Sequence, residues 1–305
     1  MAVSAHSEEV SVVVPATTAN LGPGFDSVGL CLDLVDRVSL RRRESGSSDI
    51  IDVVGAGADN VPRDESNLVL GTIKQLYRDV GIELGPLHLR CVNRIPHGMG
   101  LGSSAAAIVG ALMVAKELAR VSGCDVDDID VFQIASDMEG HPDNVGPCVF
   151  GGMSVSWDER GAWEVAQLRP DEHITACLAV PDSGLSTKAA RELIPLTISH
   201  RDAVRNTARA ALLIHAFTTD PSLLFPATQD FLHQRYRERA YPHSYALVSA
   251  LRDRGVAATI SGAGPTVIAF GTSDLMSCMR DAVGRSADHF QVVRTAINNR
   301  GAFVA

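Results

Sequence analysis

The stretch PHGMGLGSSAAA, residues 96–107, decides how the rest of the sequence is interpreted. An alternating segment rich in apolar residues, 87–95, precedes it, and an apolar run without proline follows, which together predict a strand, a glycine-rich turn and a helix. Three glycines at alternate positions let the backbone turn tightly and approach a ligand closely. The first turn of a helix offers unpaired N–H groups and about half a positive charge. The stretch therefore predicts a binding site for an anion, above all phosphate.

Two better-known glycine-rich loops do not match this stretch. A Walker A loop has a lysine after its last glycine, where this sequence has Ser103. The dinucleotide fingerprint G-x-G-x-x-G is one residue short when it is counted from Gly98. A tight strand-to-helix turn whose helix is capped by Ser103 or Ser104 remains an alternative interpretation.

The composition is that of an ordinary globular protein, with 46% hydrophobic and 21% charged residues in a chain of 305. The net charge of −9 argues against a nucleic-acid partner, because phosphate backbones require clustered Lys and Arg. The longest apolar run, residues 101–115, is shorter than the roughly 20 residues that cross a bilayer, so we expect no membrane association. Residues 1–9 do not resemble a secretory signal, and the six cysteines never form C-x-x-C. We therefore expect a cytoplasmic protein with reduced thiols.

The segment PATTANLGPGFDSVGL, residues 15–30, follows a short apolar run, residues 10–14, that we predict to be a strand ended by Pro15. Turn-forming residues, hydroxyls, an amide and a carboxylate are mixed along the segment, so we predict a loop rather than regular structure. One interpretation is a loop that satisfies its own hydrogen bonds. The other is a substrate loop in which Asn20 and Asp26 hold a polar small molecule.

A second concentration of polar groups, EGHPDNVGP, spans residues 139–147 at the end of a helix predicted over residues 125–140. A strand is predicted to follow over residues 149–156. The Pro-Asp-Asn sequence has ordinary turn chemistry, so a plain turn is one interpretation. The other is a site, because carboxylate, imidazole and amide groups close together suit substrate or metal binding.

Residues 96–106 match the phosphate loop P-x-x-x-G-L-G-S-S-A-A, and at this point the sequence resembles the galactokinase, homoserine kinase, mevalonate kinase and phosphomevalonate kinase (GHMP) family. Residues 15–29 match P-A-T/S-T/S-A-N-L/F-G-x-G-F-D-x-L/V/I-G, which is the N-terminal signature of the homoserine kinase branch. Residues 141–144 match the H-x-D-N stretch of the same branch. Other kinases of the family carry only a shorter N-terminal opening, so the resemblance to the homoserine kinase branch is the more specific one.

Three later segments extend this resemblance to nearly the whole chain. Residues 186–191 fit the pattern S-T-x-x-A-R, and residues 229–237 contain D-x-x-H-Q/E-x-Y-R. Residues 260–266 fit I/V-S-G-A/S-G-P-S/T, a glycine-rich turn between two predicted strands that a plain hairpin would also explain.

The resemblance implies an α+β, two-lobed GHMP kinase fold, with an N-terminal lobe like domain 2 of ribosomal protein S5 and a ferredoxin-like C-terminal lobe. We expect residues 1–165 to form the ATP-binding lobe and residues 166–305 the C-terminal lobe, because the chain becomes more polar near this point. The implied activity is Mg²⁺-assisted, direct transfer of a phosphoryl group from ATP to L-homoserine, giving O-phospho-L-homoserine for threonine biosynthesis. The implied partners are ATP and L-homoserine, and we expect a homodimer.

The resemblance also implies roles for individual residues. Ser104 and Glu139 would bind Mg²⁺, and together with Asp26 they form the implied catalytic set. Asn67 either caps its helix or contacts the adenine base. The implied ATP-binding residues are Asn67, Pro96, His97, Gly98, Met99, Gly100, Leu101, Gly102, Ser103, Ser104, Ala105 and Ala106. The implied homoserine-binding residues are Asn20, Asp26, His141, Asp143, Asn144, Arg191, Arg237, Gly262 and Gly264.

Two alternatives to this activity remain open at the level of sequence. One is a GHMP kinase with another substrate, of the mevalonate type, which the pair Arg191 and Arg237 disfavours because two arginines suit a carboxylate. The other is a catalytically silent nucleotide-binding regulator, which the presence of both Ser104 and Glu139 disfavours. Whether Asp26 or Asp143 acts as a general base is also open.

Overall fold

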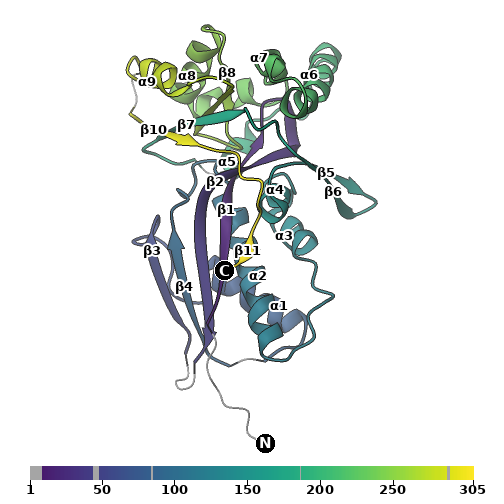
Figure 1. The fold of residues 1–305 in the computed structure, drawn as a ribbon, viewed down its shortest axis with the longest axis vertical. Coiled ribbons are helices and arrows are strands. Elements are labelled where there is room, and N and C mark those ends of the chain that lie inside the picture. The colour runs from purple at the N-terminus through teal and green to yellow at the C-terminus, as the bar shows by residue number, and fades with distance from the viewer. Residues whose placement is uncertain (1–8, 44–47, 84, 186, 287–288) are drawn as a thin grey trace, which may run out of the picture.

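The structure is a computed structural model that describes residues 9–43, 48–83, 85–185, 187–286 and 289–305. Its strands form two sheets that follow one another along the long axis of the molecule (Figure 1). Among the described residues, the larger sheet has seven strands and the smaller sheet has four. This arrangement confirms the predicted α+β, two-lobed fold, in which each sheet packs with its own helices.

The larger sheet runs in the order β11-β1-β2-β4-β3, and β5 and β6 extend it from β2. Its neighbouring strands are antiparallel except β3 and β4, which run parallel. Because β11 comes from the C-terminus, the end of the chain returns to lie beside β1 (Figure 1). The strands are β1 (Val10–Asn20), β2 (Gly24–Arg42), β3 (Ile50–Gly55), β4 (Leu87–Asn93), β5 (Met153–Glu159), β6 (Ala162–Leu168) and β11 (Phe303–Val304).

A central helix, α2, lies against β1 and β2 of this sheet, and three other helices pack beside it (Figure 1). The predicted helix is present and is buried on most of its sides, since Val109, Leu112 and Ala115 of α2 are almost inaccessible to solvent. Burial fixes the axis of α2 and therefore the direction of the N–H groups at its first turn. The helices are α1 (Leu68–Asp79), α2 (Ser103–Val121), α3 (Val131–Glu139) and α4 (Val145–Phe150).

The smaller sheet has the order β10-β7-β9-β8 with every neighbour antiparallel. Numbered along the chain, this is the order 4-1-3-2 of a split β-α-β-β-α-β unit, so the ferredoxin-like prediction is confirmed. Its strands are β7 (Thr175–Pro181), β8 (Ala257–Ile260), β9 (Val267–Gly271) and β10 (Phe290–Thr295). Its helices are α5 (Thr187–Glu192), α6 (His200–Thr218), α7 (Leu224–Ala227), α8 (Pro242–Arg252) and α9 (Met276–Val283), with the 3₁₀ helices η1 (Pro221–Leu223) and η2 (Gln234–Ala240).

The loop predicted over residues 15–30 is wrong. β1 continues through Pro15 to Asn20 and β2 begins at Gly24, so residues 21–23 alone separate the two strands. Pro15 is tolerated because the register of β1 against β2 shifts between Pro15 and Thr17, where the ladder does not need the missing N–H. The polar residues of the segment therefore stand on rigid strands rather than on a loop.

Two other element boundaries differ from the prediction. The helix expected over residues 125–140 begins at Val131, because the Asp130 carboxylate accepts the N–H groups of Phe132 and Gln133 and fixes the start. The strand expected over residues 149–156 begins at Met153, because its first residues belong to the end of α4.

The predicted division between residues 165 and 166 falls inside β6, and β6 pairs with β5 in the larger sheet. The next strand along the chain, β7, already belongs to the smaller sheet. The assignment of residues 1–165 and 166–305 to two lobes stays a prediction.

Candidate functional site

The glycine-rich stretch connects the end of β4 to the start of α2, as the sequence predicts. Its start is held by Asp36 of β2, whose carboxylate accepts the N–H groups of Arg94 at 2.5 Å and Ile95 at 2.9 Å. Gly100 and Gly102 have left-handed φ values of 74° and 66°. A Cβ on Gly100 would lie 2.3 Å from the Ser261 carbonyl oxygen, so glycine is required there by space as well as by conformation.

The carbonyl groups of this loop all point toward the rest of the protein. Four consecutive carbonyl oxygens, from Gly98 to Leu101, accept hydrogen bonds from distant segments. The contacts are Leu185 N to Gly98 O (2.9 Å), Thr266 N to Met99 O (3.3 Å), Ser261 Oγ to Gly100 O (2.6 Å) and Thr17 N to Leu101 O (3.2 Å). Within the described parts of the chain, the N–H groups of residues 98–104 donate to no other group. The loop therefore presents a row of unpaired donors, followed by the N-terminus of a buried helix, which is an anion-binding arrangement.

These donors border a cleft of about 150 Å³, which gathers most of the residues implied by the resemblance. The lining residues come from elements far apart in the sequence, among them β1, β2, α2, α5, η2 and the turn between β8 and β9. The lining residues are Asn20, Asp26, Gly98, Gly100, Gly102, Ser103, Ser104, Ala105, Glu139, His141, Asp143, Asn144, Arg191, Arg237, Gly262 and Ala263.

Ser104 and Glu139 meet at one end of the cleft. Ser104 is exposed in the first turn of α2, and its hydroxyl donates a short hydrogen bond to Oε1 of Glu139, the last residue of α3. Burial raises the pKa of Glu139, and the hydrogen bond from Ser104 only partly offsets this rise. The two side chains thus offer a hydroxyl and a carboxylate, both hard oxygen donors, beside the row of N–H groups.

His141 and Asp143 form a hydrogen-bonded pair on the next turn, with 2.6 Å between Nδ1 and Oδ1. Burial, the largest single effect on His141, favours the neutral ring. The hydrogen bond to Asp143 and the nearby carboxylates outweigh it, so the pKa of His141 is raised. Asn144 also approaches Asp143, and its Oδ1 accepts the hydroxyl of Thr17 at 2.9 Å. The orientation of the Asn144 amide is therefore set by β1.

Asn20 and Asp26 stand at the two sides of the β1–β2 turn. The Asn20 side chain donates to the carbonyl of Gly262 at 2.9 Å and accepts the N–H of Asp26 at 3.0 Å. Asn20 and Asp26 both have left-handed φ values, 70° and 56°. This local conformation ties the turn to residue 262 and directs the Asp26 carboxylate toward Arg191.

The two arginines of the cleft have different surroundings. Arg191 on α5 makes two hydrogen bonds of 2.8 Å with the two carboxylate oxygens of Asp26, a bidentate ion pair. Arg237 in η2 is 2% exposed and donates from Nε to the carbonyl of Ala190 at 3.1 Å. No carboxylate of the described residues pairs with Arg237, and burial lowers the pKa of its guanidinium. A buried cation that pairs with no carboxylate of the described residues and lines an open cleft has the charge and position that suit an external anion.

Comparison with known proteins shows the family of this chain. Residues 67–152 match the family description "GHMP kinases N terminal domain", and residues 211–287 match "GHMP kinases C terminal". The chain is 45% identical over 265 residues to a homoserine kinase of Streptomyces coelicolor, covering 87% of this chain and 85% of that protein. The chain belongs to the GHMP kinase family.

Other relatives of this GHMP kinase support the same assignment. A homoserine kinase of Leifsonia xyli is 41% identical over 306 residues, covering 99% of this chain and 94% of that protein. The crystal structure of homoserine kinase from Cytophaga hutchinsonii superposes with a TM-score of 0.85 at 26% identity and covers all of both chains. A mevalonate diphosphate decarboxylase from Legionella pneumophila shares the fold, with a TM-score of 0.63 at 15% identity over 94% of this chain and 100% of that one. The likeness to homoserine kinases thus extends over the whole length of the GHMP fold.

A second, mostly apolar pocket of about 310 Å³ adjoins the cleft of this GHMP kinase at Ser103 and Ser104. Val53, Val69 and Ala106 line it, together with His97 and Asn67. Asn67 accepts the N–H of Leu70 at 3.1 Å and donates to the carbonyl of Pro62 at 2.8 Å. Its predicted role as the cap of α1 is confirmed, and its contact with an adenine base stays a prediction.

Four of the implied residues line neither pocket: Pro96, Met99, Leu101 and Gly264. Leu101 is 1% exposed and belongs to the hydrophobic core beneath the loop. Gly264 lies in the turn between β8 and β9, where a Cβ would come within 3.0 Å of Ile260 and Tyr241 side-chain atoms. Leu101 and Gly264 therefore support the loop and the turn on the side that faces away from the cleft.

The structure also identifies three residues that the sequence analysis did not select. Thr17 and Ser261 hold the glycine-rich loop, and Thr17 also orients Asn144. His233 contacts Arg237, with 3.3 Å between Nδ1 and Nη1. Each of the three lies within a matched motif, so the motifs themselves were the available signal.

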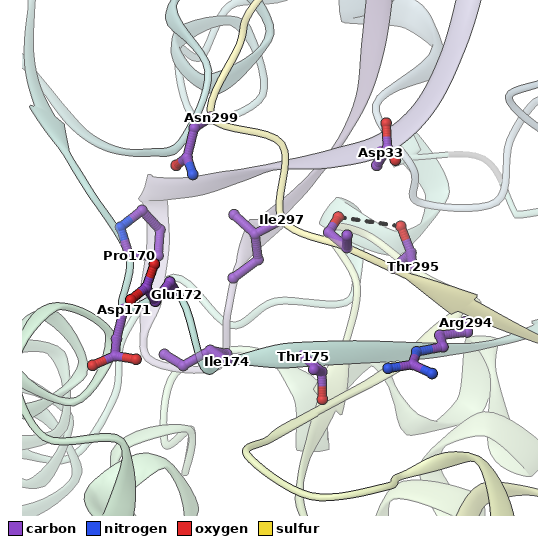
Figure 2. Close-up of a pocket in the computed structure, with 11 residues that line it drawn as sticks. Asp33, Pro170, Asp171, Glu172, Ile174, Thr175, Arg294, Thr295, Ile297 and Asn299 are labelled. Carbon is purple, nitrogen blue, oxygen red and sulfur yellow. Dashed lines mark hydrogen bonds between the residues drawn. The ribbon is translucent and has the colours of Figure 1, made fainter.

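A larger pocket of about 410 Å³ lies apart from this site (Figure 2). Asp33 of β2 and Ile297 border it on one side, and Thr175 of β7 and Arg294 of β10 border it on the other. None of its lining residues is one that the resemblance implies. It is therefore not the candidate active site.

Within the ranges that the structure describes, no three His, Cys, Asp or Glu side chains cluster in a way that could hold a metal ion. In the same ranges no helix has both the length and the apolar character needed to cross a bilayer.

Proposed function

We propose that this GHMP kinase transfers the γ-phosphoryl group of ATP to the side-chain hydroxyl of L-homoserine, giving O-phospho-L-homoserine and ADP, a step of threonine biosynthesis. The homoserine kinases that match at 40–45% identity over most of the chain support this activity. The observation that carries it is the cleft itself, where loop amides and a buried arginine lie across from one another, and neither has a hydrogen-bonding or carboxylate partner, respectively, among the described residues. One end suits a phosphate and the other suits the carboxylate of an amino acid.

The tail of ATP would bind along residues 98–104. The N–H groups there are unpaired among the described residues, and α2 adds the positive end of its dipole. The adjoining apolar pocket at Asn67 and His97 would receive the adenine and ribose, because it opens onto Ser103 and Ser104. Phosphoryl transfer depends mainly on positioning and charge stabilisation, which a rigid cradle of this kind supplies.

Ser104 and Glu139 fit a Mg²⁺ ion carried by the nucleotide. They supply a hydroxyl and a carboxylate oxygen, and Mg²⁺ typically takes one or two protein oxygens with phosphate and water for the rest. The absence of a cluster of three acidic or His side chains among the described residues is consistent with such a shared site. The bound ion would neutralise charge on the transferring phosphoryl group.

The amino-acid substrate would bind between Arg237, Asp26 and Arg191. Arg237 would receive the carboxylate, because it is the buried cation without a carboxylate partner. The Asp26–Arg191 pair presents one negative and one positive group, which match the ammonium and carboxylate of a zwitterion. His141 and Asn144 line the remaining side and would direct the hydroxyl toward the phosphate end.

We also propose that transfer needs no dedicated general base. Asp143 is 2% exposed and already accepts a hydrogen bond from His141, and Asp26 is paired with Arg191. Neither carboxylate is therefore available to an incoming hydroxyl without losing its partner. The loose transition state of phosphoryl transfer requires little activation of the nucleophile.

A coupled assay of ADP release tests the proposed function. L-homoserine should be turned over with ATP and Mg²⁺, and other hydroxy amino acids and mevalonate should be much poorer substrates. Turnover of mevalonate instead would indicate a different GHMP kinase. Tight ATP binding without turnover of any acceptor would indicate a regulator.

Replacing Ser104 by alanine should lower kcat about 10- to 100-fold, because a hydroxyl ligand and the partner of Glu139 are lost together. Ser104 is exposed, so the melting temperature should not change. Steady-state kinetics at saturating ATP and homoserine would measure this. The control is the exchange S122A, at the opposite end of α2. An unchanged kcat in S104A would remove Ser104 from the metal site.

Replacing Arg191 by alanine should raise the KM for homoserine about 10- to 100-fold, because the exchange leaves Asp26 without its partner and removes a ligand for the substrate carboxylate. The KM for ATP should stay within about twofold of wild type, since Arg191 is remote from the loop amides in this mechanism. The exposed Arg201 on α6 provides the control R201A. An unaltered KM for homoserine would contradict the proposed clamp.

A further inference from the structure

His233 occupies a fully buried position immediately before η2, and its ring contacts both the β1–β2 turn and Arg237. Its Nε2 lies 2.9 Å from the carbonyl oxygen of Gly22, in the β1–β2 turn. Its Nδ1 lies 3.3 Å from Nη1 of Arg237. The ring also stacks on Phe25, with 5.0 Å between ring centroids. A buried imidazole with two specific polar partners has a defined protonation state.

The partners of His233 fix that state. A carbonyl oxygen can only accept, so Nε2 must carry a hydrogen and donate it to Gly22. A guanidinium can only donate, so Nδ1 must present its lone pair to Arg237. The neutral tautomer with hydrogen on Nε2 is the one state that satisfies both contacts. Burial favours the same conclusion, because it lowers the pKa of His233 and keeps the ring uncharged.

The backbone that carries His233 is held from both sides. The Asp230 carboxylate accepts the N–H groups of Leu232, His233 and Gln234 at 2.8, 3.1 and 2.7 Å. The Gln234 side chain accepts the N–H of Ile260 at 2.8 Å, which ties the turn to β8. The ring therefore cannot shift without breaking several buried hydrogen bonds.

The Gly22 carbonyl is equally well fixed. Gly22 packs so closely that a Cβ would lie 2.3 Å from the carbonyl oxygen of Thr228. Asn206 joins the same two segments, since it donates to the carbonyl of Pro23 at 2.8 Å and accepts the N–H of Phe231 at 3.1 Å. The turn that separates Asn20 from Asp26 is thus locked to the turn that carries His233.

We propose that His233 is a positioning residue, which holds the Arg237 guanidinium in the cleft so that it receives the carboxylate of the amino-acid substrate. Arg237 has two fixed polar contacts, Nε to the carbonyl of Ala190 and Nη1 to His233, and its guanidinium lies 5.3 Å from the centroid of the Phe25 ring. None of these contacts supplies a counterion, and no carboxylate of the described residues pairs with it. Two anchored donors fix the plane of the guanidinium and orient the remaining donors toward the cleft it lines. This role rests on the proposed function, and it explains the histidine in the D-x-x-H-Q-x-Y-R segment.

Two exchanges test the role of His233. H233F keeps an aromatic ring against Phe25 but removes both nitrogen contacts, and H233Q restores a donor and an acceptor on one side chain. We expect H233F to raise the KM for homoserine about 10- to 100-fold, with kcat and the KM for ATP within about threefold of wild type. H233Q should recover most of the loss. The control is R235Q, two residues after His233 in η2, because the Arg235 side chain is exposed and pairs with Asp202.

A substrate analogue separates positioning from general structural damage. The carboxamide of L-homoserine lacks the charged group that Arg237 would bind, so its KM or inhibition constant should be nearly the same for wild type and H233F. The double variant H233F/R237M should bind homoserine no more weakly than R237M alone. Equal losses for homoserine and its amide, or additive losses in the double variant, would overturn the positioning role.

A measurement without substrate covers the possibility that the proposed function fails. The ¹⁵N shifts of the His233 ring at pH 7, assigned by comparison with H233Q, should show hydrogen on Nε2 and none on Nδ1. R237M should perturb the Nδ1 signal. A wild type that does not turn over homoserine would refute the proposed function, whereas an active wild type with an unaffected H233F, or a ring protonated on Nδ1, would refute the inference alone.

Discussion

Replacing Glu139 by glutamine is expected to lower kcat about 100- to 1,000-fold, because the amide cannot supply the negative oxygen that would hold Mg²⁺ beside the transferring phosphoryl group. The exchange keeps the shape of the side chain and its contact with Ser104. Homoserine binding should change little, since Glu139 lies at the Ser104 end of the cleft. Steady-state kinetics at several Mg²⁺ concentrations would measure the loss, with the exposed Glu164 of β6 providing the control E164Q.

The stability of the same variant gives an independent check. The pKa of Glu139 is raised in the folded protein by burial. A carboxyl group of this kind favours folding most below its unfolded pKa, and that contribution is lost as the pH rises through the folded value. At about pH 7 the ionised group therefore opposes folding, and glutamine removes this opposition. The melting temperature of E139Q should equal or exceed that of wild type at pH 7, and the difference should shrink toward about pH 4, near the pKa of a free carboxyl. A kcat within about threefold of wild type would remove Glu139 from the metal site.

The phosphate loop and its helix could be predicted from sequence because their determinants are local. Alternate glycines, the serines after them and a long apolar run all lie within residues 96–121, and the structure has α2 where the pattern predicts it. What the pattern could not show is why the loop amides are unpaired. That depends on Thr17, Ser261 and Leu185, which hold the loop carbonyls from three distant segments.

The N-terminal segment shows the opposite case. Residues 15–30 have the composition of a loop, yet they form the facing ends of β1 and β2, and residues 28–30 of β2 also pair with β5. The bulge after Pro15 and the left-handed conformations of Asn20 and Asp26 are set by pairing with β2 and by contact with Gly262. Local propensity was overridden by tertiary contacts here, as is common for strands.

The matched motifs contain most of the residues that line the cleft, but they do not distinguish the two arginines. Arg191 and Arg237 both end a motif, and both have basic or polar neighbours in the sequence. The difference lies in partners that are more than 40 residues away along the chain: Asp26 for Arg191, and the carbonyl of Ala190 for Arg237. Because of this difference, we expect Arg237 to contribute more than Arg191 to homoserine binding.

Replacing Arg237 by methionine is therefore expected to have the larger effect on homoserine binding of the two arginine exchanges. Truncating one member of a buried, hydrogen-bonded charge pair costs about 2 to 5 kcal/mol, so the KM for homoserine should rise at least about 30-fold. R237K should also bind poorly, because a lysine keeps the charge but not the planar fork that His233 and Ala190 hold. The KM for ATP should remain within about twofold of wild type.

Protein stability separates this prediction from simple unfolding. Burial lowers the pKa of Arg237, which means that the folded protein holds the charged form at a cost. Methionine fills a similar volume without charge, so it relieves that cost while it loses two hydrogen bonds, and the melting temperature should stay within a few degrees of wild type. The exposed neighbour Arg235 supplies the matched control R235M. Saturating homoserine should raise the melting temperature of wild type and of R235M but not of R237M, because a ligand stabilises a protein only as far as it binds the folded state. If homoserine stabilised R237M as much as wild type, Arg237 would not hold the carboxylate, and Arg191 would have to hold it without Arg237.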